Sequence, residues 1–421
     1  MSHTKYLIVG CSHAGLTAME TIRLQDSEGA ITMVTREETL PYSPTILPYF
    51  IAGQVPQEQI FLRDQAYFDK LNVTLLKGAA VVGADSAAKT IRLASGDEIH
   101  YEKLLLATGA GATVPPFPGI ENVRYQVVRD LNDALKLRET MNQAKSAIVI
   151  GAGLIAMHSA ENLAHAGLKV SMVVRRKVSL FAYFDVAAAG LIEKIFEDNG
   201  VHIATGSGVA KISPSDGGRC VVTLESGEDL TGDVLLLAAG VRPRIEYLEG
   251  SGIETDAGIL VDNSMRTSAA DIWAAGDVAQ APQFFEPGKT VNATLPNAVT
   301  QGRVAGMDMV SDPAFKPYSG SSGLNTFNFF GHHAFSVGLA TIAEPTEDIE
   351  VNTTLLPSGL RYQKLVFQKD RLVGVSAINA ALDPGIMREL IRRQTDLGAI
   401  KEKFVSAPLE TGRLLMSKLW R

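Results

Sequence analysis

Residues 6–15 read Tyr6-Leu7-Ile8-Val9-Gly10-Cys11-Ser12-His13-Ala14-Gly15. The four leading apolar residues of this stretch are typical of a strand that is buried on both faces of a parallel sheet. We expect a tight glycine turn after them, then a helix over residues 14–24 and a second strand over residues 31–34. Strand, turn, helix and strand together predict a βαβ unit.

The turn fits G-x-S-x-x-G, a variant of the dinucleotide-binding pattern G-x-G-x-x-G. Gly10 permits the tight turn, Ser12 is small enough for the backbone to approach a pyrophosphate, and Gly15 lets the helix pack closely on the strand. The N-terminus of the helix stabilises phosphate charge. Glu37 lies 22 residues past Gly15, where a carboxylate can accept hydrogen bonds from ribose hydroxyls. The predicted site therefore contains Gly10, Ser12, His13, Ala14, Gly15 and Glu37, and the alternative is a glycine turn without a ligand.

The same pattern recurs about 140 residues later in the chain. Apolar residues 147–150 lead into Gly151-Ala152-Gly153-Leu154-Ile155-Ala156, which is G-x-G-x-x-A, an accepted form of the fingerprint. We expect a helix from there to about His165 and a strand over residues 169–174. This second predicted site contains Gly151, Gly153, Leu154 and Ile155.

The segment after that strand carries Arg175 and Arg176 and no acidic residue. NAD sites usually place an acid here, whereas arginines can accommodate the 2′-phosphate of NADP. The residues alone thus favour NADP, and a solvated basic turn is the alternative.

Two more stretches, residues 103–110 and 234–241, resemble each other as apolar strands that end in small residues. A Ser-Gly turn precedes each of them, which predicts a hairpin that leads into a closing strand. Three residues at the ends of these strands are further candidates for cofactor binding, namely Thr108, Gly109 and Gly240.

Beyond about Ser321 the pattern changes to antiparallel strands, with a turn near residues 369–370. Two amphipathic helices are expected around residues 384–395 and 408–420. We therefore predict an α/β fold with two Rossmann-like dinucleotide-binding domains and a C-terminal α+β domain.

A third motif reads Thr267-Ser268-Ala269-Ala270-Asp271-Ile272-Trp273-Ala274-Ala275-Gly276-Asp277-Val278. With both glycine loops and the two echoing strands, it resembles the FAD-dependent pyridine nucleotide-disulfide oxidoreductase superfamily. The resemblance implies that Gly276 and Asp277 bind FAD, with Asp277 on the ribityl chain, and that residues 294–309 form a helix that covers the flavin.

The same resemblance implies an order of domains along the chain. It places an FAD-binding domain at residues 1–118 and 243–320, interrupted by an NAD(P)-binding domain at residues 119–242. A C-terminal interface domain follows at residues 321–421.

The missing cysteines distinguish branches of this superfamily. Disulfide reductases carry two cysteines beside the flavin, and single-cysteine relatives carry one where Thr45 falls here, but residues 41–53 contain none. Cys11 and Cys220, the two cysteines present, are expected to be structural. The stretch resembles the PY-x-R-x-x-L segment of ferredoxin, rubredoxin and nitrite reductase-type flavoproteins, with Pro44 in place of the basic residue.

No catalytic side chain is expected, because the flavin carries the chemistry. Thr45 and His158 are the candidate neighbours of the reacting rings. His158 stands where the family has a glutamate, and a structural role in the helix is the alternative for it.

Composition narrows the remaining classes. The net charge of −7 argues against a general nucleic-acid binder. No run of 18 apolar residues and no secretory signal pattern is present, so we expect a cytoplasmic protein without a membrane span. No residue pattern predicts a metal site.

The resemblance implies hydride transfer between NAD(P)(H) and FAD, and single-electron transfer between FAD and an iron–sulfur partner. One reading is the FAD subunit of a larger oxidoreductase, such as tungsten-containing aldehyde oxidoreductases or 2-oxoacid:acceptor complexes of aromatic degradation, which favours NAD. The alternatives are a stand-alone NAD(P)H:ferredoxin or rubredoxin reductase and a flavin-bearing redox sensor or structural protein. Either a hetero-oligomer or a homodimer is compatible with these readings.

A basic segment bears on the partner. Residues 388–421 hold eight basic and four acidic residues, a net charge of +4. Such a segment could steer an acidic electron carrier, and two solvated amphipathic helices are the alternative.

Overall fold

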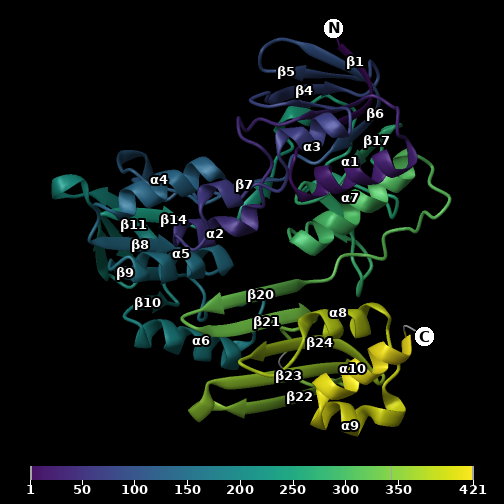
Figure 1. The fold of residues 1–421 in the computed structure, drawn as a ribbon. Helices are drawn as coiled ribbons and strands as arrows, with labels where there is room; N and C mark the ends of the chain where they lie inside the picture. Colours follow the sequence, from purple (N-terminus) through teal and green to yellow (C-terminus); the bar gives the residue numbers. More distant parts are fainter. Residues whose placement is uncertain (1, 343, 420–421) are drawn as a thin grey trace. The chain divides into compact units, whose positions relative to one another are not determined.

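The computed structural model describes residues 2–342 and 344–419. The chain divides into two compact units, drawn as ribbons in Figure 1. Unit 1 contains residues up to Ala112, the short segment Arg129–Leu131, and residues Val241–Ser322. Unit 2 contains Thr113–Val128, Asn132–Gly240 and the segment that starts at Gly323.

Unit 1 is built on a sheet in the order β3-β2-β1-β6-β5-β4, with β17 also paired to β6. The strands β3, β2, β1, β6 and β17 are parallel, and β5 and β4 are antiparallel additions. Leu7, Ile8 and Leu105 are fully buried at the centre, as expected for strands covered on both faces. The bounds are β1 Ser2–Val9, β2 Ile31–Val34, β3 Val73–Leu76, β4 Val81–Asp85, β5 Thr90–Leu93, β6 Glu98–Leu106 and β17 Ile272–Ala274.

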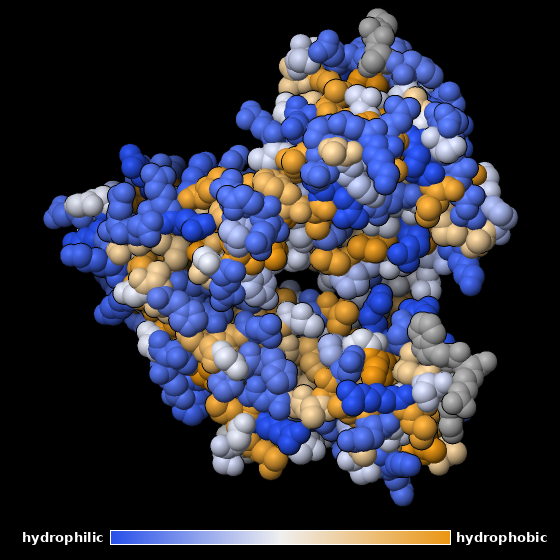
Figure 2. Space-filling view, viewed as in Figure 1, coloured by the Kyte–Doolittle hydropathy of each residue, from blue (hydrophilic) through white to orange (hydrophobic). Residues whose placement is uncertain are grey.

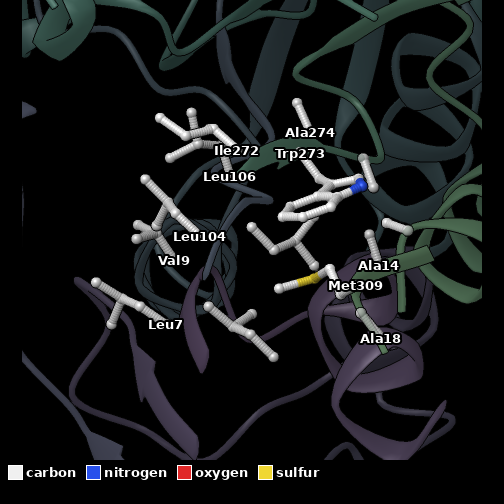
Figure 3. Packing of buried hydrophobic residues seen from close by; sticks show 14 of the residues in the cluster. Leu7, Val9, Ala14, Ala18, Leu104, Leu106, Ile272, Trp273, Ala274 and Met309 are labelled. Atoms are coloured by element: carbon white, nitrogen blue, oxygen red, sulfur yellow. The ribbon is translucent and has the colours of Figure 1, made fainter. Parts of the chain in front are cut away.

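Two helices, α1 (His13–Gln25) and α7 (Leu295–Met309), lie side by side in unit 1 (Figure 1). They approach so closely that a Cβ added at Gly302 would lie 2.3 Å from the carbonyl oxygen of Ala14. Figure 3 shows Trp273 and Met309 packed together beside the α1 residue Ala18. At Gly302, the close approach of α1 and α7 therefore depends on the absence of a side chain.

Short elements complete unit 1. The helices are α2 (Leu47–Ile51) and α3 (Gln65–Lys70). The remaining strands are β7 (Ala110–Ala112), β15 (Val241–Pro243), β16 (Ile259–Leu260), β18 (Ala279–Pro282) and β19 (Lys289–Thr290). β7 and β15 pair with each other as an antiparallel ribbon.

The first part of unit 2 repeats the parallel design in a sheet of order β10-β9-β8-β14. An antiparallel sheet β11-β12-β13 precedes the closing strand β14. The strands are β8 Ser146–Ile150, β9 Lys169–Val174, β10 His202–Thr205, β11 Val209–Pro214, β12 Cys220–Leu224, β13 Asp229–Gly232 and β14 Val234–Leu237. The helices are α4 Leu131–Met141, α5 Leu154–His165 and α6 Val186–Asp198.

The second part of unit 2 is an antiparallel sheet of order β20-β21-β24-β23-β22 with three helices. The turn between β23 and β24 uses Lys369 and Asp370, both with positive φ, which is the geometry of a tight hairpin turn. The strands are β20 Leu324–Phe329, β21 His332–Gly338, β22 Ile349–Leu356, β23 Arg361–Gln368 and β24 Arg371–Ile378. The helices are α8 Pro384–Arg392, α9 Lys401–Ser406 and α10 Pro408–Leu419.

Several sequence-based expectations match these elements. The strands predicted over residues 31–34 and 169–174 are β2 and β9, and the turn predicted near residues 369–370 is present. The chain passes between the two units at 112/113, 240/241 and 322/323, with residues 129–131 returning to unit 1. The assignment of four segments to named domains stays a prediction.

The described surface mixes hydrophilic and scattered hydrophobic residues, as Figure 2 shows for one face. Among the described residues, no helix combines the length and apolar character needed to cross a bilayer. Of these same residues, none gathers with others into a cluster of three or more metal-binding side chains.

The α1–α7 contact gives a first prediction, the effect of Gly302→Ala. The new Cβ meets backbone, not a flexible side chain, so overpacking should cost about 1–3 kcal/mol. This outweighs the gain of about 1 kcal/mol that alanine brings as a better helix former. We expect a lower thermal unfolding midpoint, measured by circular dichroism. Gly190→Ala in α6 is the control, because its Cβ would meet nothing within 4 Å, and it should leave the midpoint unchanged or raise it. Equal effects of the two variants would contradict the packing argument.

Candidate functional site

The turn between β1 and α1 forms the centre of the site in unit 1. Gly10 has φ +112°, and a Cβ there would lie 2.0 Å from the carbonyl oxygen of Ala107 at the end of β6. A Cβ at Gly15 would lie 1.9 Å from the oxygen of Gly10. Ser12 is the N-cap residue of α1, and its side chain makes no capping hydrogen bond. The turn is thus closely packed on its inner side, and the backbone at the start of α1 is suited to an anion.

The third motif meets this turn directly. A Cβ at Gly276 would lie 3.1 Å from the Cβ of Ala14, so the loop after β17 lies against the start of α1. The Gly276 amide donates to Gln301 Oε1 of α7 at 2.8 Å. These contacts place the adjacent Asp277 beside the first glycine loop.

Asp277 forms an ion pair that the sequence alone did not predict. Arg129 donates from Nη2 to Asp277 Oδ2 at 2.9 Å and from Nε to the carbonyl oxygen of Ala110 at 2.8 Å. Both side chains are mostly buried, with exposed fractions of 23% and 21%. A Cβ at Gly109 would lie 3.7 Å from the Arg129 guanidinium, so this arginine brings Gly109 and Asp277 together.

Glu37 lies at the other end of the same loop cluster, after β2. Tyr42 donates its hydroxyl hydrogen to Glu37 Oε2 at 2.6 Å, and the Tyr42 oxygen accepts from the Leu131 amide at 2.8 Å. Burial raises the pKa of Glu37 above its ordinary value, while the Tyr42 hydrogen bond lowers it. The Tyr42 hydrogen bond thereby holds the Glu37 carboxyl group in place, and its contact with a ribose stays a prediction.

His13, Ser43 and Thr45 form a chain of hydrogen bonds. His13 Nε2 lies 2.7 Å from Ser43 Oγ, which lies 2.7 Å from Thr45 Oγ1. Burial lowers the pKa of His13, and the nearby Asp277 carboxylate opposes that shift. Thr45, predicted to neighbour the flavin, is exposed.

Thr108, which follows β6, is held through its hydroxyl group. The hydroxyl donates to the Arg244 carbonyl oxygen at 3.1 Å and lies 3.2 Å from the Tyr247 hydroxyl.

Both cysteines are buried free thiols. Burial raises the pKa of Cys11 and of Cys220, so neither is a reactive thiolate at neutral pH. Their geometry agrees with structural roles.

The second glycine loop repeats the geometry of the first in unit 2. Gly151 has φ +154°, and a Cβ there would lie 2.3 Å from the carbonyl oxygen of Ala238 after β14. Gly153 is the N-cap residue of α5, and a Cβ there would meet nothing within 4 Å, so the backbone is open on that side. Leu154 and Ile155 begin the helix, and the Ile155 side chain is exposed. Gly240 also has a positive φ and open space around it.

The two arginines after β9 are exposed. The guanidinium carbon of Arg176 lies 3.8 Å from the centroid of the Phe181 ring, a cation–π contact. The Arg176 carbonyl oxygen accepts from the Gly206 amide at 2.8 Å. Arg176 is therefore stacked on an aromatic ring at the edge of the predicted coenzyme site.

His158 lies within unit 2 against the C-terminal sheet. Its ring meets the Phe327 ring edge-to-face, with 4.8 Å between the centroids, and its Nδ1 lies 3.9 Å from Glu161 Oε2. Burial lowers the pKa of His158 to about 4, so the ring is neutral at neutral pH. This environment favours the structural alternative over the nicotinamide-facing one.

Known proteins that resemble this chain point to one family. A family model described as pyridine nucleotide-disulphide oxidoreductase matches residues 4–302. The chain belongs to this family. It is 48% identical to "NADH-dependent phenylglyoxylate dehydrogenase subunit epsilon" of Aromatoleum evansii, with 100% of this chain and 99% of the relative covered.

Two further similarities extend the comparison, one in sequence and one in fold. "Rubredoxin-NAD(+) reductase" of Pseudomonas putida is 27% identical over 89% of this chain and 95% of its own length. Putidaredoxin reductase, in its covalent complex with putidaredoxin, has a similar fold with a TM-score of 0.85, covering 97% of this chain and 100% of that one, at 22% identity. The predicted α/β class with Rossmann-like domains is thereby confirmed, as is the predicted superfamily.

Family members bind FAD and NAD(P)H, and these are the cofactors of this chain. The residues present fit these cofactors. Unit 1 has a closely packed turn at Gly10 and a helix N-terminus without a side-chain cap. It also has two carboxylates, Asp277 and Glu37, that accept hydrogen bonds from other segments. Unit 2 offers the open backbone at Gly153. The role of each individual residue stays a prediction.

The Arg129–Asp277 pair gives a second prediction, for Arg129→Gln. Without the guanidinium, the Asp277 carboxylate loses its fixed direction, and its predicted charge-assisted hydrogen bond to FAD is lost. Such a bond is worth about 1.5–3 kcal/mol, so we expect FAD to bind about 10- to 150-fold more weakly. The measurement is the dissociation constant of FAD, from flavin fluorescence after apoprotein is titrated with FAD. Arg63→Gln is the matched control, because Arg63 pairs with Glu20 at 2.6 Å elsewhere in unit 1 and should not change the constant. Unchanged affinity in Arg129→Gln would exclude a role for the pair in FAD binding.

Tyr42 gives a third prediction, which concerns pH. Tyr42→Phe removes the hydrogen bond that lowers the pKa of Glu37, so that pKa rises further. Only the carboxylate accepts both ribose hydroxyls, so FAD should be released at a higher pH than from the unaltered protein as the pH falls. The release is followed by flavin fluorescence in an acid titration. Tyr67→Phe is the control, since Tyr67 makes the equivalent bond to Glu20 at 2.7 Å away from the glycine loops. Coincident titrations of Tyr42→Phe and the unaltered protein would refute the prediction.

Proposed function

We propose that this chain is the flavin-bearing subunit of a multi-subunit dehydrogenase that exchanges electrons between NADH and an iron–sulfur subunit. The observation that carries the proposal is 48% identity, across essentially both full lengths, to a subunit of an NADH-dependent phenylglyoxylate dehydrogenase. Phenylglyoxylate is a 2-oxoacid, so among the expected complexes the 2-oxoacid type is favoured over the aldehyde oxidoreductase type. The proposal places the protein in the cytoplasm.

Bound FAD supplies the chemistry, because it can take two electrons as a hydride and release them singly. The residues of unit 1 hold and orient it: the turn at Gly10 receives the pyrophosphate, Glu37 the ribose hydroxyls and Asp277 the ribityl chain. Arg129 offsets the charge of Asp277 and fixes its direction. The turn at Gly151 receives the pyrophosphate of the coenzyme in the same way.

The absence of a reactive thiol supports an external electron partner. Cys11 and Cys220 are buried thiols with raised pKa values, and Ser43 and Thr45 occupy the stretch where relatives of the disulfide type carry cysteines. No side chain in this stretch can store electrons. The electrons therefore pass to or from a second redox protein or subunit.

The coenzyme proposed is NADH, against the local preference for NADP drawn from Arg175 and Arg176. The relative at 48% identity is NADH-dependent by name. Arg176 makes a cation–π contact with Phe181, and this contact accounts for the arginine without a 2′-phosphate.

A stand-alone reductase for a small electron carrier is the second candidate. It is favoured by the similarity to rubredoxin-NAD(+) reductase over 89% of the chain. The basic segment at residues 388–421 adds little to it, because Arg392 and Arg393 pair with Glu389, and Lys401 pairs with Glu350 and Asp370. Arg421 of that segment lies outside the described residues.

The fourth prediction tests the proposed function by anaerobic stopped flow. Mixing the FAD-loaded chain with NADH should bleach the flavin absorbance, and NADPH should do so at least about tenfold more slowly, since a tenfold difference needs only about 1.4 kcal/mol of discrimination. Faster bleaching by NADPH would overturn the choice of NADH and support a 2′-phosphate site at Arg175 and Arg176. No bleaching by either coenzyme would overturn the proposed function.

A second mixing step separates the two candidates. The chain reduced by NADH is mixed with oxidised rubredoxin or ferredoxin, and oxidation of the flavin is followed. Slow transfer to both free carriers supports a subunit that uses a dedicated partner. Rapid transfer to one of them supports the stand-alone reductase.

A further inference from the structure

We propose that Asp185 is a positioning residue for the coenzyme, because it ties the segment after β9 to the C-terminal sheet of unit 2 through Lys364 and Tyr362. The inference rests on the proposed function, since it takes residues 175–185 as one wall of the coenzyme site. It adds that the affinity for the coenzyme depends on a sheet remote in sequence from the glycine loop.

The segment is fastened to the loop that precedes it. The Leu180 amide donates to the carbonyl oxygen of Ala152, inside the second glycine loop, at 2.7 Å. The Ser179 amide donates to Glu193 Oε1 of α6 at 2.5 Å. Leu180 is fully buried and adopts φ +54°, a conformation uncommon for leucine, so the surrounding contacts determine the course of the chain here. A shift of this segment would therefore move the glycine loop as well.

The same region presents apolar side chains to the outside. Ile155, Phe181 and Val186 have exposed fractions of 38%, 42% and 69%. Ile155 begins α5, Phe181 carries the Arg176 guanidinium, and Val186 begins α6. Phe181 alone lies on the segment, and the other two residues lie on the helices α5 and α6. A bound coenzyme is a reason for large apolar side chains to be exposed here.

Asp185 ends the segment and makes three kinds of contact. Its Oδ1 accepts from the Ala188 amide at 3.0 Å, which caps the N-terminus of α6. Its Oδ2 accepts from Lys364 Nζ at 2.7 Å and from the Tyr362 hydroxyl at 2.5 Å, both on β23. Lys364 also donates to the carbonyl oxygen of Ile342 at 3.0 Å. One carboxylate thus joins the segment, α6 and the C-terminal sheet.

The junction is buried. The Lys364 side chain has no exposed surface, and that of Asp185 is 11% exposed. The hydrogen bonds from the Ala188 amide, Lys364 and Tyr362 lower the pKa of Asp185 in spite of its burial, so it is a carboxylate at neutral pH. Loss of one partner of a buried pair leaves an uncompensated charge, which drives local rearrangement. The rearrangement falls on the segment that ends at Asp185.

Further contacts between the same parts involve α5 and the far end of α6. The Phe330 amide donates to Glu161 Oε1 at 2.6 Å, and Phe196 of α6 stacks on Phe327 and Phe329 of β20. These contacts hold the two parts together independently of Asp185. Variants of the Asp185 junction are therefore expected to remain folded and to alter the segment locally.

The fifth prediction compares four variants of the FAD-loaded full chain. Asp185→Asn keeps the cap and the size but loses the charge, Lys364→Met removes the ammonium, and Tyr362→Phe removes one donor. Lys194→Met is the matched control, because it breaks an exposed Lys–Asp pair with Asp198 on the same helix. The readouts are the dissociation constant of NAD⁺, from quenching of protein or flavin fluorescence, and KM and kcat for NADH with an artificial dye.

We expect Asp185→Asn and Lys364→Met to raise both the NAD⁺ dissociation constant and KM by about tenfold or more, with kcat at saturating NADH within about twofold of the unaltered protein. Tyr362→Phe should raise them by about threefold, and Lys194→Met should change neither. The bound FAD per chain should stay the same in all four, because unit 1 is not altered.

The opposite result is equally clear. Wild-type coenzyme affinity in folded Lys364→Met and Tyr362→Phe would show that the junction is only structural and would overturn the inference. If Lys364→Met does not accumulate as a folded protein, the Tyr362→Phe result decides. If the unaltered chain neither binds nor oxidises NADH, the proposed function is overturned. If the unaltered chain binds NADH and all variants bind it equally well, only the inference about Asp185 is overturned.

Discussion

Each of the two parallel sheets requires a glycine at the turn after its first strand, because two backbone segments approach closely there. At Gly10 the chain passes so near Ala107 that no Cβ fits, and at Gly151 it passes equally near Ala238. In each case the turn after the first strand touches the end of the strand that closes the sheet. The contact sets where the turn lies against the sheet, and the helix begins directly after it in both units.

Two carboxylates near the first glycine turn are held by hydrogen bonds from other segments. Asp277 and Glu37 are both partly buried, and each is held by a donor from another segment, Arg129 for the first and Tyr42 for the second. Residues 129–131 contribute to both arrangements, since the Leu131 amide donates to Tyr42. A segment of three residues that belongs to unit 1 thus orders the carboxylates expected to hold the flavin nucleotide.

The sequence allowed the first two strands and the closing strand of each parallel sheet to be predicted, because these stretches are mostly apolar and lie next to glycine turns. It did not predict β3, β10 or β17 of the same sheets. It did not reveal β20 or β22, whose sequences mix asparagine and threonine with apolar residues and so lack a clear period. Arg129 was also missed, because 148 positions separate it from Asp277 and only the fold brings them together. Lys364 looks like any charged residue on a strand, and its complete burial follows from a partner, Asp185, on a distant loop.

The short ribbon formed by β7 and β15 brings together two points that are far apart along the chain. Ala112 lies opposite Val241, so the chain first leaves unit 1 and later re-enters it at neighbouring points, with residues 129–131 returning to it in between. A domain whose two ends are adjacent can be inserted into a host fold, exchanged or lengthened without rearranging the host's strands. The two parallel sheets with similar glycine turns lie in separate units, so the ligand contacts of one can change without rearranging the strands of the other.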